Sequence, residues 1–137
     1  MTEDTVFMKI IRREIPADIV YEDASTIAFL DIRPNNPGHT LVVPKTFARN
    51  IFDIRDETLD AVMHTVRLIA PAVRNAVSAD GMTIIMNNEP ASGQIVFHAH
   101  VHLIPRFSND GFGHLPQKQY VPGEAASIAE KIRQALA

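Results

Sequence analysis

Apolar positions recur along the chain with two different spacings, which predict both strands and helices. Alternating or continuous apolar runs at residues 19–21, 26–30, 39–43 and 82–86 are typical of β-strands. Between residues 56 and 78, apolar residues instead return every three or four positions, as they do on one face of a helix. The sequence therefore predicts one long helix that packs against a β-sheet.

Shorter segments complete the predicted domain. Apolar residues at helical spacing between Asp4 and Arg13 predict a short helix that is capped by Asp4. Two prolines, two asparagines and a glycine occupy residues 33–38, so these are expected to form a loop. The segment after residue 106 lacks periodicity until residues 125–136, which are expected to form a terminal helix.

The composition fits one globular domain. The chain has 137 residues, of which 46% are hydrophobic and 21% charged, enough apolar material to bury one core. We therefore interpret residues 1–137 as a single domain with a core at about 4–106 and a tail at 107–137. The formal net charge of −3 argues against general binding to nucleic acid or to anionic membranes.

Cysteine is absent from the sequence, which excludes disulfides, thiolate nucleophiles and thiolate zinc ligands. Residues 1–4 form an acidic start without a basic segment followed by an apolar run. No stretch approaches the roughly 18 consecutive apolar residues of a membrane-spanning helix. We therefore expect a cytoplasmic protein that does not insert into a membrane.

Three histidines, His98, His100 and His102, alternate with apolar residues near the end of the predicted sheet. Because alternate side chains of a strand point to the same face, the three imidazoles should line one surface about 6.5 to 7 Å apart. The intervening residues, Ala99 and Val101 among them, are expected to pack inward. Since imidazole titrates near neutral pH, one ring can attack a substrate while another protonates the leaving group.

A metal site is the main alternative for such a row, because imidazole is a common ligand of zinc and copper. Alternating histidines can converge on one ion. However, the candidate carboxylates are remote in sequence, and a further histidine ligand would have to be His39 or His114. We therefore predict no metal at the site, and we expect His64 and His114 to be solvated.

Motifs at four places resemble the histidine triad family. Residues 98–104 look like its defining signature, and residues 36–45 resemble its first histidine segment. Residues 88–94 stand where the family has its phosphate-binding loop. Residues 7–17 are similar to the histidine triad nucleotide-binding protein branch. The resemblance covers residues 4–106.

The resemblance implies an α+β fold. Its core would be a five-stranded antiparallel sheet with one long and one short helix, followed here by a C-terminal helix. Two copies are expected to form a homodimer in which the sheets join into one continuous ten-stranded sheet. Such pairing would also cover a sheet edge that is otherwise left open.

The resemblance also implies an activity. Members of the family cleave purine nucleoside phosphoramidates or related nucleotidyl substrates at the α-phosphorus, by way of a nucleotidyl-histidine intermediate, and release a nucleoside monophosphate. The reaction requires no cofactor. Two alternatives stay open, namely hydrolysis of dinucleoside polyphosphates and a catalytically weak adaptor that binds nucleotide.

Roles carry over from the family residue by residue. His100 would be the nucleophile and His102 would assist the leaving group, with His98 and His39 supporting the orientation and protonation of the nucleophile. The substrate-binding residues would be Asn88, Gln94 and Gly93 at the phosphate, Asp31 at the ribose, and Val6, Phe7, Ile10, Phe29 and Ile32 around the base. Each of these also has a structural alternative, as a core residue or as a partner of loop backbone groups.

Three features depart from the family pattern. Part of the family binds structural zinc through a cysteine pair, and Thr5 and Met8 stand at the corresponding positions, so no such zinc is expected. The animal phosphoramidases have a serine after the loop glutamine, where this chain has Ile95. An apolar side chain there cannot form a hydrogen bond with the leaving group. The tail after residue 106 differs as well.

Overall fold

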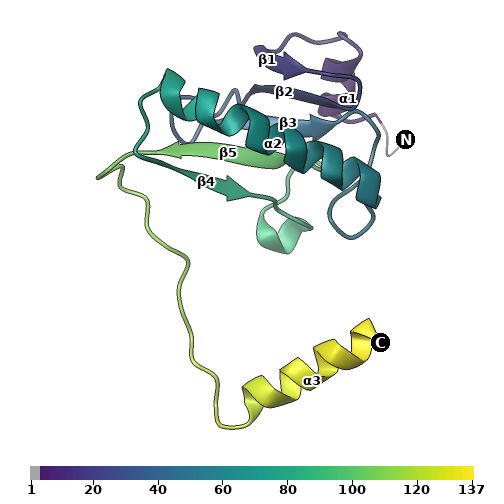
Figure 1. Cartoon of the computed structure of the whole chain (residues 1–137), viewed down its shortest axis with the longest axis vertical. Helices are drawn as coiled ribbons and strands as arrows, with labels where there is room; N and C mark the ends of the chain where they lie inside the picture. The colour runs from purple at the N-terminus through teal and green to yellow at the C-terminus, as the bar shows by residue number, and fades with distance from the viewer. Residues whose placement is uncertain (1–3) are drawn as a thin grey trace.

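A computed structural model describes residues 4–137 of the chain, and its elements are labelled in Figure 1. Within those residues, the strands are β1 (Ile19–Glu22), β2 (Thr26–Leu30), β3 (Thr40–Pro44), β4 (Gly81–Ile85) and β5 (Val101–Arg106). The helices are α1 (Val6–Ile11), α2 (Asp56–Ala76), the 3-10 turn η1 (Pro90–Ser92) and α3 (Glu124–Leu136). The strands form one antiparallel sheet in the order β1-β2-β3-β5-β4. This confirms the predicted α+β fold with a five-stranded antiparallel sheet.

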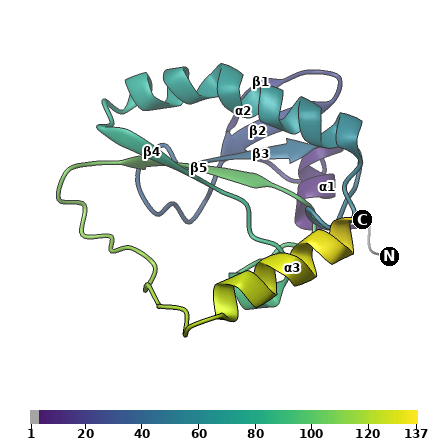
Figure 2. The same cartoon turned by 60° about the horizontal axis from the view of Figure 1, so that its bottom comes forward.

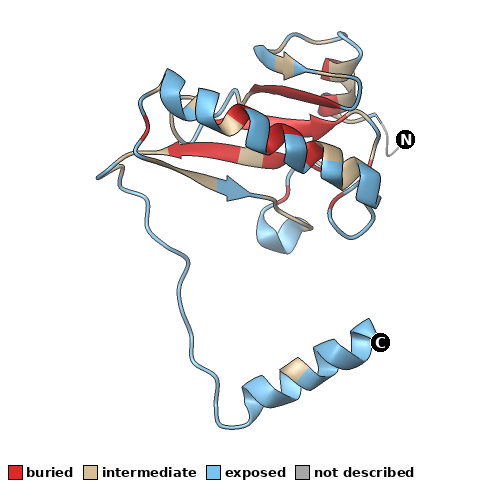
Figure 3. Ribbon diagram, viewed as in Figure 1, coloured by how far each residue is buried: buried red, intermediate tan, exposed pale blue. Residues whose placement is uncertain are grey.

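Helix α2 lies across one face of the sheet and α1 lies against the other (Figure 2). Both faces of the central strands are therefore buried, as the red colour shows in Figure 3. Toward α2, the core consists of Ala28, Val42, Val62, Val66, Ile69, Val101 and Leu103. Toward α1, it consists of Phe7, Ile10, Ile27, Phe29, Leu41 and Val43. Alternation along β2 and β3 thus builds two cores, one on each face.

The N-cap of helix α1 lies one residue later than predicted. Thr5 is the N-cap, because its hydroxyl accepts a hydrogen bond of 3.2 Å from the Met8 amide. Asp4 instead forms an ion pair with Arg12 at 2.7 Å, so its predicted role as the cap is wrong. Apart from Asp4, the acidic start of the chain lies outside the described residues.

The histidine triad is only partly in a strand, which corrects the expectation that all three imidazoles share one strand face. Strand β5 begins at Val101, so among the three only His102 belongs to it. Continuing the register of β3 with β5 would place Pro44 opposite Ala99. Because proline has no amide hydrogen, pairing stops there, and the Pro44 carbonyl accepts a hydrogen bond from the His98 ring instead.

The C-terminal tail stands away from the core in Figure 1. Residues 107–123, which we call the arm, contain no helix or strand, and they lead to α3 beyond the edge of β4. No residue of α3 is buried, and Ile132 and Leu136 expose 56% and 81% of their surface. Like every helix within residues 4–137, α3 is too short or too polar to cross a membrane.

Candidate active site

A cavity of about 400 Å³ opens on the face of the sheet that α1 covers. Its walls come from α1, from β2 with the loop that follows it, and from the histidine segment. Nine residues predicted for the site line it: Val6, Phe7, Ile10, Phe29, Asp31, Ile32, Gly93, His100 and His102. The fold therefore brings most of the predicted site together from segments far apart in the sequence.

His100 presents an unshared electron pair to this cavity. Its Nδ1 lies 2.7 Å from the carbonyl oxygen of His98. Because a carbonyl can only accept a hydrogen bond, Nδ1 carries the hydrogen and Nε2 of the neutral ring keeps its lone pair. Burial lowers the pKa of His100, which favours the neutral ring. The ring is therefore held in the tautomer that a nucleophile needs.

His102 presents a hydrogen instead. The Asn35 amide donates to Nδ1 of His39 at 3.0 Å, so the neutral His39 ring carries its hydrogen on Nε2. That nitrogen lies 2.9 Å from Nδ1 of His102 and donates to it, which leaves the hydrogen of neutral His102 on Nε2. Burial, together with the neighbouring His100 and His39, lowers the pKa of His102 to about 4. The resemblance assigned His39 to the nucleophile, whereas the structure places its hydrogen bond on His102.

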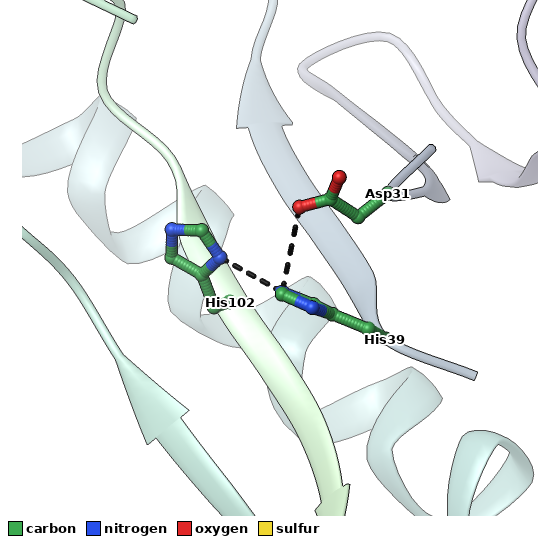
Figure 4. Close-up of side chains that lie close together, drawn as sticks. All are labelled: Asp31, His39 and His102. Atoms are coloured by element: carbon green, nitrogen blue, oxygen red, sulfur yellow. Dashed lines mark hydrogen bonds and ion pairs between the residues drawn. The ribbon is translucent and has the colours of Figure 1, made fainter. Parts of the chain in front are cut away.

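Asp31 lies beside this pair although it is remote in sequence from His102. One of its carboxylate oxygens is 3.7 Å from Nε2 of His39 (Figure 4). Asp31, His39 and His102 thus bring possible ligand atoms within 4.8 Å of one another. The Asn35 amide, however, keeps a hydrogen on Nε2 of His39, and that nitrogen has no lone pair for an ion. The donors therefore fit a chain of hydrogen bonds better than a metal site.

Comparison with known proteins identifies the family of this chain. The model of the HIT domain family matches residues 12–109. The chain belongs to this family. Both the cavity and all four histidines of the site lie within or directly beside the matched segment, whereas most of the arm and all of α3 lie beyond it.

Three HIT-family relatives are similar to this chain over most of its length. The purine nucleoside phosphoramidase of Escherichia coli K12 is 41% identical over 76% of this chain and 88% of its own. A crystal structure of a HIT family member from Bacillus subtilis is 40% identical and superposes with a TM-score of 0.90, covering 98% of this chain and 99% of that chain. A HIT family protein from Bacillus anthracis is 35% identical, with the same TM-score and the same coverage.

His98 supports the site of this HIT-domain protein from beneath. Its side chain is fully buried, and its Nε2 donates to the Pro44 carbonyl at 2.8 Å. Its Nδ1 therefore accepts, and it lies 3.3 Å from the hydroxyl of Thr5. The ring does not line the cavity, and its contribution to the nucleophile is the backbone carbonyl that fixes the tautomer of His100.

The side chains of Asn88 and Gln94 bind protein rather than lining the cavity. Asn88 accepts a hydrogen bond of 2.8 Å from the Ile51 amide. The Gln94 side chain is buried and donates to the carbonyls of Arg49 and Val96. This is the structural alternative that the sequence left open for both residues. Their contact with a phosphate remains a proposal about the loop as a whole.

Asn87 is a cavity residue that the sequence analysis missed. A Cβ added at Gly93 would lie 3.9 Å from the side-chain nitrogen Nδ2 of Asn87, so the two residues are close neighbours. Successive side chains near a strand end point in opposite directions, and Asn88 turns toward Ile51. That alternation is the signal that could have assigned the cavity to the first asparagine of the pair. Ile95 also lines the cavity and is 85% exposed at its mouth.

Glu89, in the same loop, has an unusual backbone. Its φ of 74° and ψ of 159° fall in a region that only glycine adopts without strain, which costs other residues roughly 1–3 kcal/mol. Arg49 donates two hydrogen bonds of 2.8 Å to its carboxylate, and the buried Asn50 donates a third of 2.6 Å. These bonds lower the pKa of Glu89 to about 2, which keeps it ionised.

Proposed function

We propose that this HIT-domain protein hydrolyses a purine nucleoside phosphoramidate or a related nucleotidyl substrate and releases a nucleoside monophosphate. One observation carries the proposal. The free Nε2 of His100 and the Nε2 hydrogen of His102 belong to adjacent rings in one cavity, and the centroids of these rings are 4.9 Å apart. A lone pair can attack phosphorus without prior deprotonation, and the adjacent hydrogen can serve the leaving group. The name of the Escherichia coli relative supports the same reaction.

In the first step, Nε2 of His100 attacks the α-phosphorus and the bond from phosphorus to the leaving nitrogen breaks. The negative phosphate raises the pKa of His102 in the complex, so that His102 takes up a proton and gives it to the departing amine. The His98 carbonyl stabilises the positive charge that forms on the His100 ring. In the second step, water attacks phosphorus and gives a proton to His102, and His100 leaves as the neutral ring.

The apolar part of the cavity suits a nucleoside base. Phe7 and Phe29 meet edge to face, with ring centroids 5.5 Å apart, and Ile10 packs beside them. Asp31 stands between this apolar part and the histidines, where it can accept hydrogen bonds from ribose hydroxyls. Gly93 has a φ of 101° and no side chain, so backbone can approach a phosphate closely there.

We also propose that the protein works as a homodimer in which two sheets join along β4. Within residues 4–137, strand β4 pairs only with β5 and its other edge is free, and Ile84 on it is 48% exposed. The superpositions on the two bacillus structures cover 98% of this chain, so they include the arm and α3. The arm and α3 therefore superpose on the matching segments of two crystal structures, although α3 buries no residue against its own core. A defined position of this kind requires a surface against which the segment packs. A second copy of the chain supplies that surface.

Release of AMP from adenosine 5′-phosphoramidate in the presence of a chelator tests the activity. We expect turnover by the wild type, and a loss of about a thousandfold or more in the His100→Ala variant, because the nucleophile is removed. The matched control is His64→Ala, an exposed histidine on α2, which should keep full activity.

Four other outcomes would contradict the proposal. Unchanged turnover by His100→Ala would exclude the nucleophilic role, and loss of wild-type activity with chelator would favour a metal-dependent hydrolase. Hydrolysis of a diadenosine polyphosphate without any phosphoramidate cleavage would favour the dinucleoside polyphosphate alternative. Binding of AMP with no turnover of either substrate would favour the adaptor.

A further inference from the structure

Two loops beside the cavity are joined through Glu89. One loop, residues 45–53, carries Arg49 and Asn50, both of which donate to the Glu89 carboxylate. The other loop, residues 87–94, contains Glu89 and leads into the cavity wall at Gly93 and Ile95. Gln94 strengthens the connection, because its side-chain oxygen accepts from Asn50 at 3.0 Å and from the Glu89 amide at 2.8 Å.

The backbone of Glu89 also organises the turn that follows it. Its carbonyl accepts hydrogen bonds from the amides of Ser92 and Gln94, at 3.1 and 3.3 Å. The amide of Ile95, by contrast, donates to no backbone acceptor within residues 4–137. The orientation of the peptide at Glu89 therefore determines where Gly93 and the Ile95 amide stand relative to His100.

Stability alone does not explain a glutamate at this position. The side chains of Arg49 and Glu89 are 45% and 40% exposed, so solvent screens much of the attraction between them even though the pair is bidentate. A glycine would adopt the same backbone conformation without strain. The strained residue is thus held by its side chain in one conformation, a combination that is characteristic of functional sites.

We propose that Glu89 is a positioning residue for the hydrolysis at His100. Its carboxylate, bound by Arg49 and Asn50, fixes the turn that brings Gly93 and the Ile95 amide against the reacting phosphate. The role rests on the proposed function, since it acts on the transition state at phosphorus. It goes beyond that function because Glu89 itself does not line the cavity.

Steady-state hydrolysis of adenosine 5′-phosphoramidate by the full-length chain tests this role, with Glu89→Gly and Glu89→Ala measured well below their unfolding temperatures. Both variants should lower kcat by about 10- to 100-fold, because a small misplacement of groups around a transition state has effects of that size. KM should change less than about threefold, because the nucleoside part of the cavity is untouched. Glu130→Gln removes the exposed pair with Arg133 in α3 and serves as the matched control.

The glycine variant separates positioning from folding. It relieves the backbone strain, so it should unfold at a temperature no lower than that of Glu89→Ala while it still loses kcat. A Glu89→Gly variant with kcat within about twofold of the wild type would overturn the proposal, because the side chain would then serve folding alone.

Hydrogen exchange keeps this test separate from the proposed activity. If the wild type turns over no phosphoramidate, the proposed function fails, while AMP still serves as a probe of the loop. Bound AMP should slow amide exchange at residues 93–96 in the wild type and not in Glu89→Gly. Equal protection by AMP in both proteins would overturn the positioning role.

Discussion

In the histidine cluster, the nitrogen that carries the hydrogen of each ring is determined by a neighbouring group that can only donate or only accept a hydrogen bond. A carbonyl fixes the ring of His100, and a backbone amide fixes the ring of His39 and, through it, that of His102. The sequence could predict which histidines gather, because their alternation is a local pattern. It could not predict the tautomers, because the Asn35 amide that sets two of them comes from a loop whose shape no periodicity determines.

Buried neutral histidines make the stability of the fold depend on pH. The pKa of His102 is lowered from 6.5 to about 4, so at intermediate pH the folded protein binds fewer protons than the unfolded chain. The contribution of neutral His102 to the free energy of unfolding is therefore complete above about pH 6.5, and it is lost as the pH falls toward 4. At pH 5 the loss for His102 should be about 2 kcal/mol. Burial lowers the pKa of His39, His98 and His100 in the same direction.

Urea unfolding at pH 7.5 and at pH 5 measures this effect. The free energy of unfolding should be lower at pH 5, and the difference should shrink in His102→Gln, which has no titrating ring. A His64→Gln variant, altered at an exposed position of α2, should keep the wild-type difference. Equal stability at the two pH values would show that the cluster is not neutral in the folded state.

At the scale of the elements, helix α1 connects the core on its own side of the sheet to the triad through the hydroxyl of Thr5. Thr5 caps the helix by accepting from the Met8 amide, and it also lies within hydrogen-bond distance of the His98 ring. Sequence patterns predicted this helix and the long helix α2 because one apolar face of each is buried. They could not decide between Asp4 and Thr5 as the cap, since both are good capping residues. Nor could they show that β3 ends opposite Ala99, because strand pairing is not a local property.

The Thr5→Val variant tests this connection. Valine has nearly the same shape as threonine, but it cannot cap α1 and it leaves Nδ1 of His98 without a donor. The free energy of unfolding should fall by about 1–3 kcal/mol, measured by urea denaturation at neutral pH. Thr5→Ser keeps the hydroxyl and should lose much less. Equal losses in the two variants would mean that packing of the methyl group, and not the hydroxyl, holds α1 in place.

At the scale of the whole molecule, the arm is hydrogen-bonded to the core at its start, through Ser108 and Asp110, whereas α3 buries none of its residues. Within the described residues, the core buries its apolar side chains on both faces of the sheet, whereas α3 exposes an apolar stripe that includes Ile128, Ile132 and Leu136. The sequence predicted α3 from its periodicity. It could not predict that α3 stands apart, because an amphipathic pattern shows that a face needs a partner and not which partner it has.

Removing residues 111–137 tests the dimer. The shortened chain should keep a folded core, because the removed segment buries no core residue, and it should dissociate at protein concentrations where the full chain stays paired. Analytical ultracentrifugation over a concentration series measures both. A full-length chain that sediments as a monomer at micromolar concentration would contradict the proposed homodimer, and an unchanged dimer without the arm would place all of the binding on β4.

The exposed arm also bears on the lifetime of the protein in the cell. Proteases cleave extended segments far more readily than folded ones, and in a single copy residues 107–123 are such a segment. If only dimerisation protects the arm from proteases, newly made chains that stay monomeric are the ones that are degraded. The concentration of this protein would then set its own half-life.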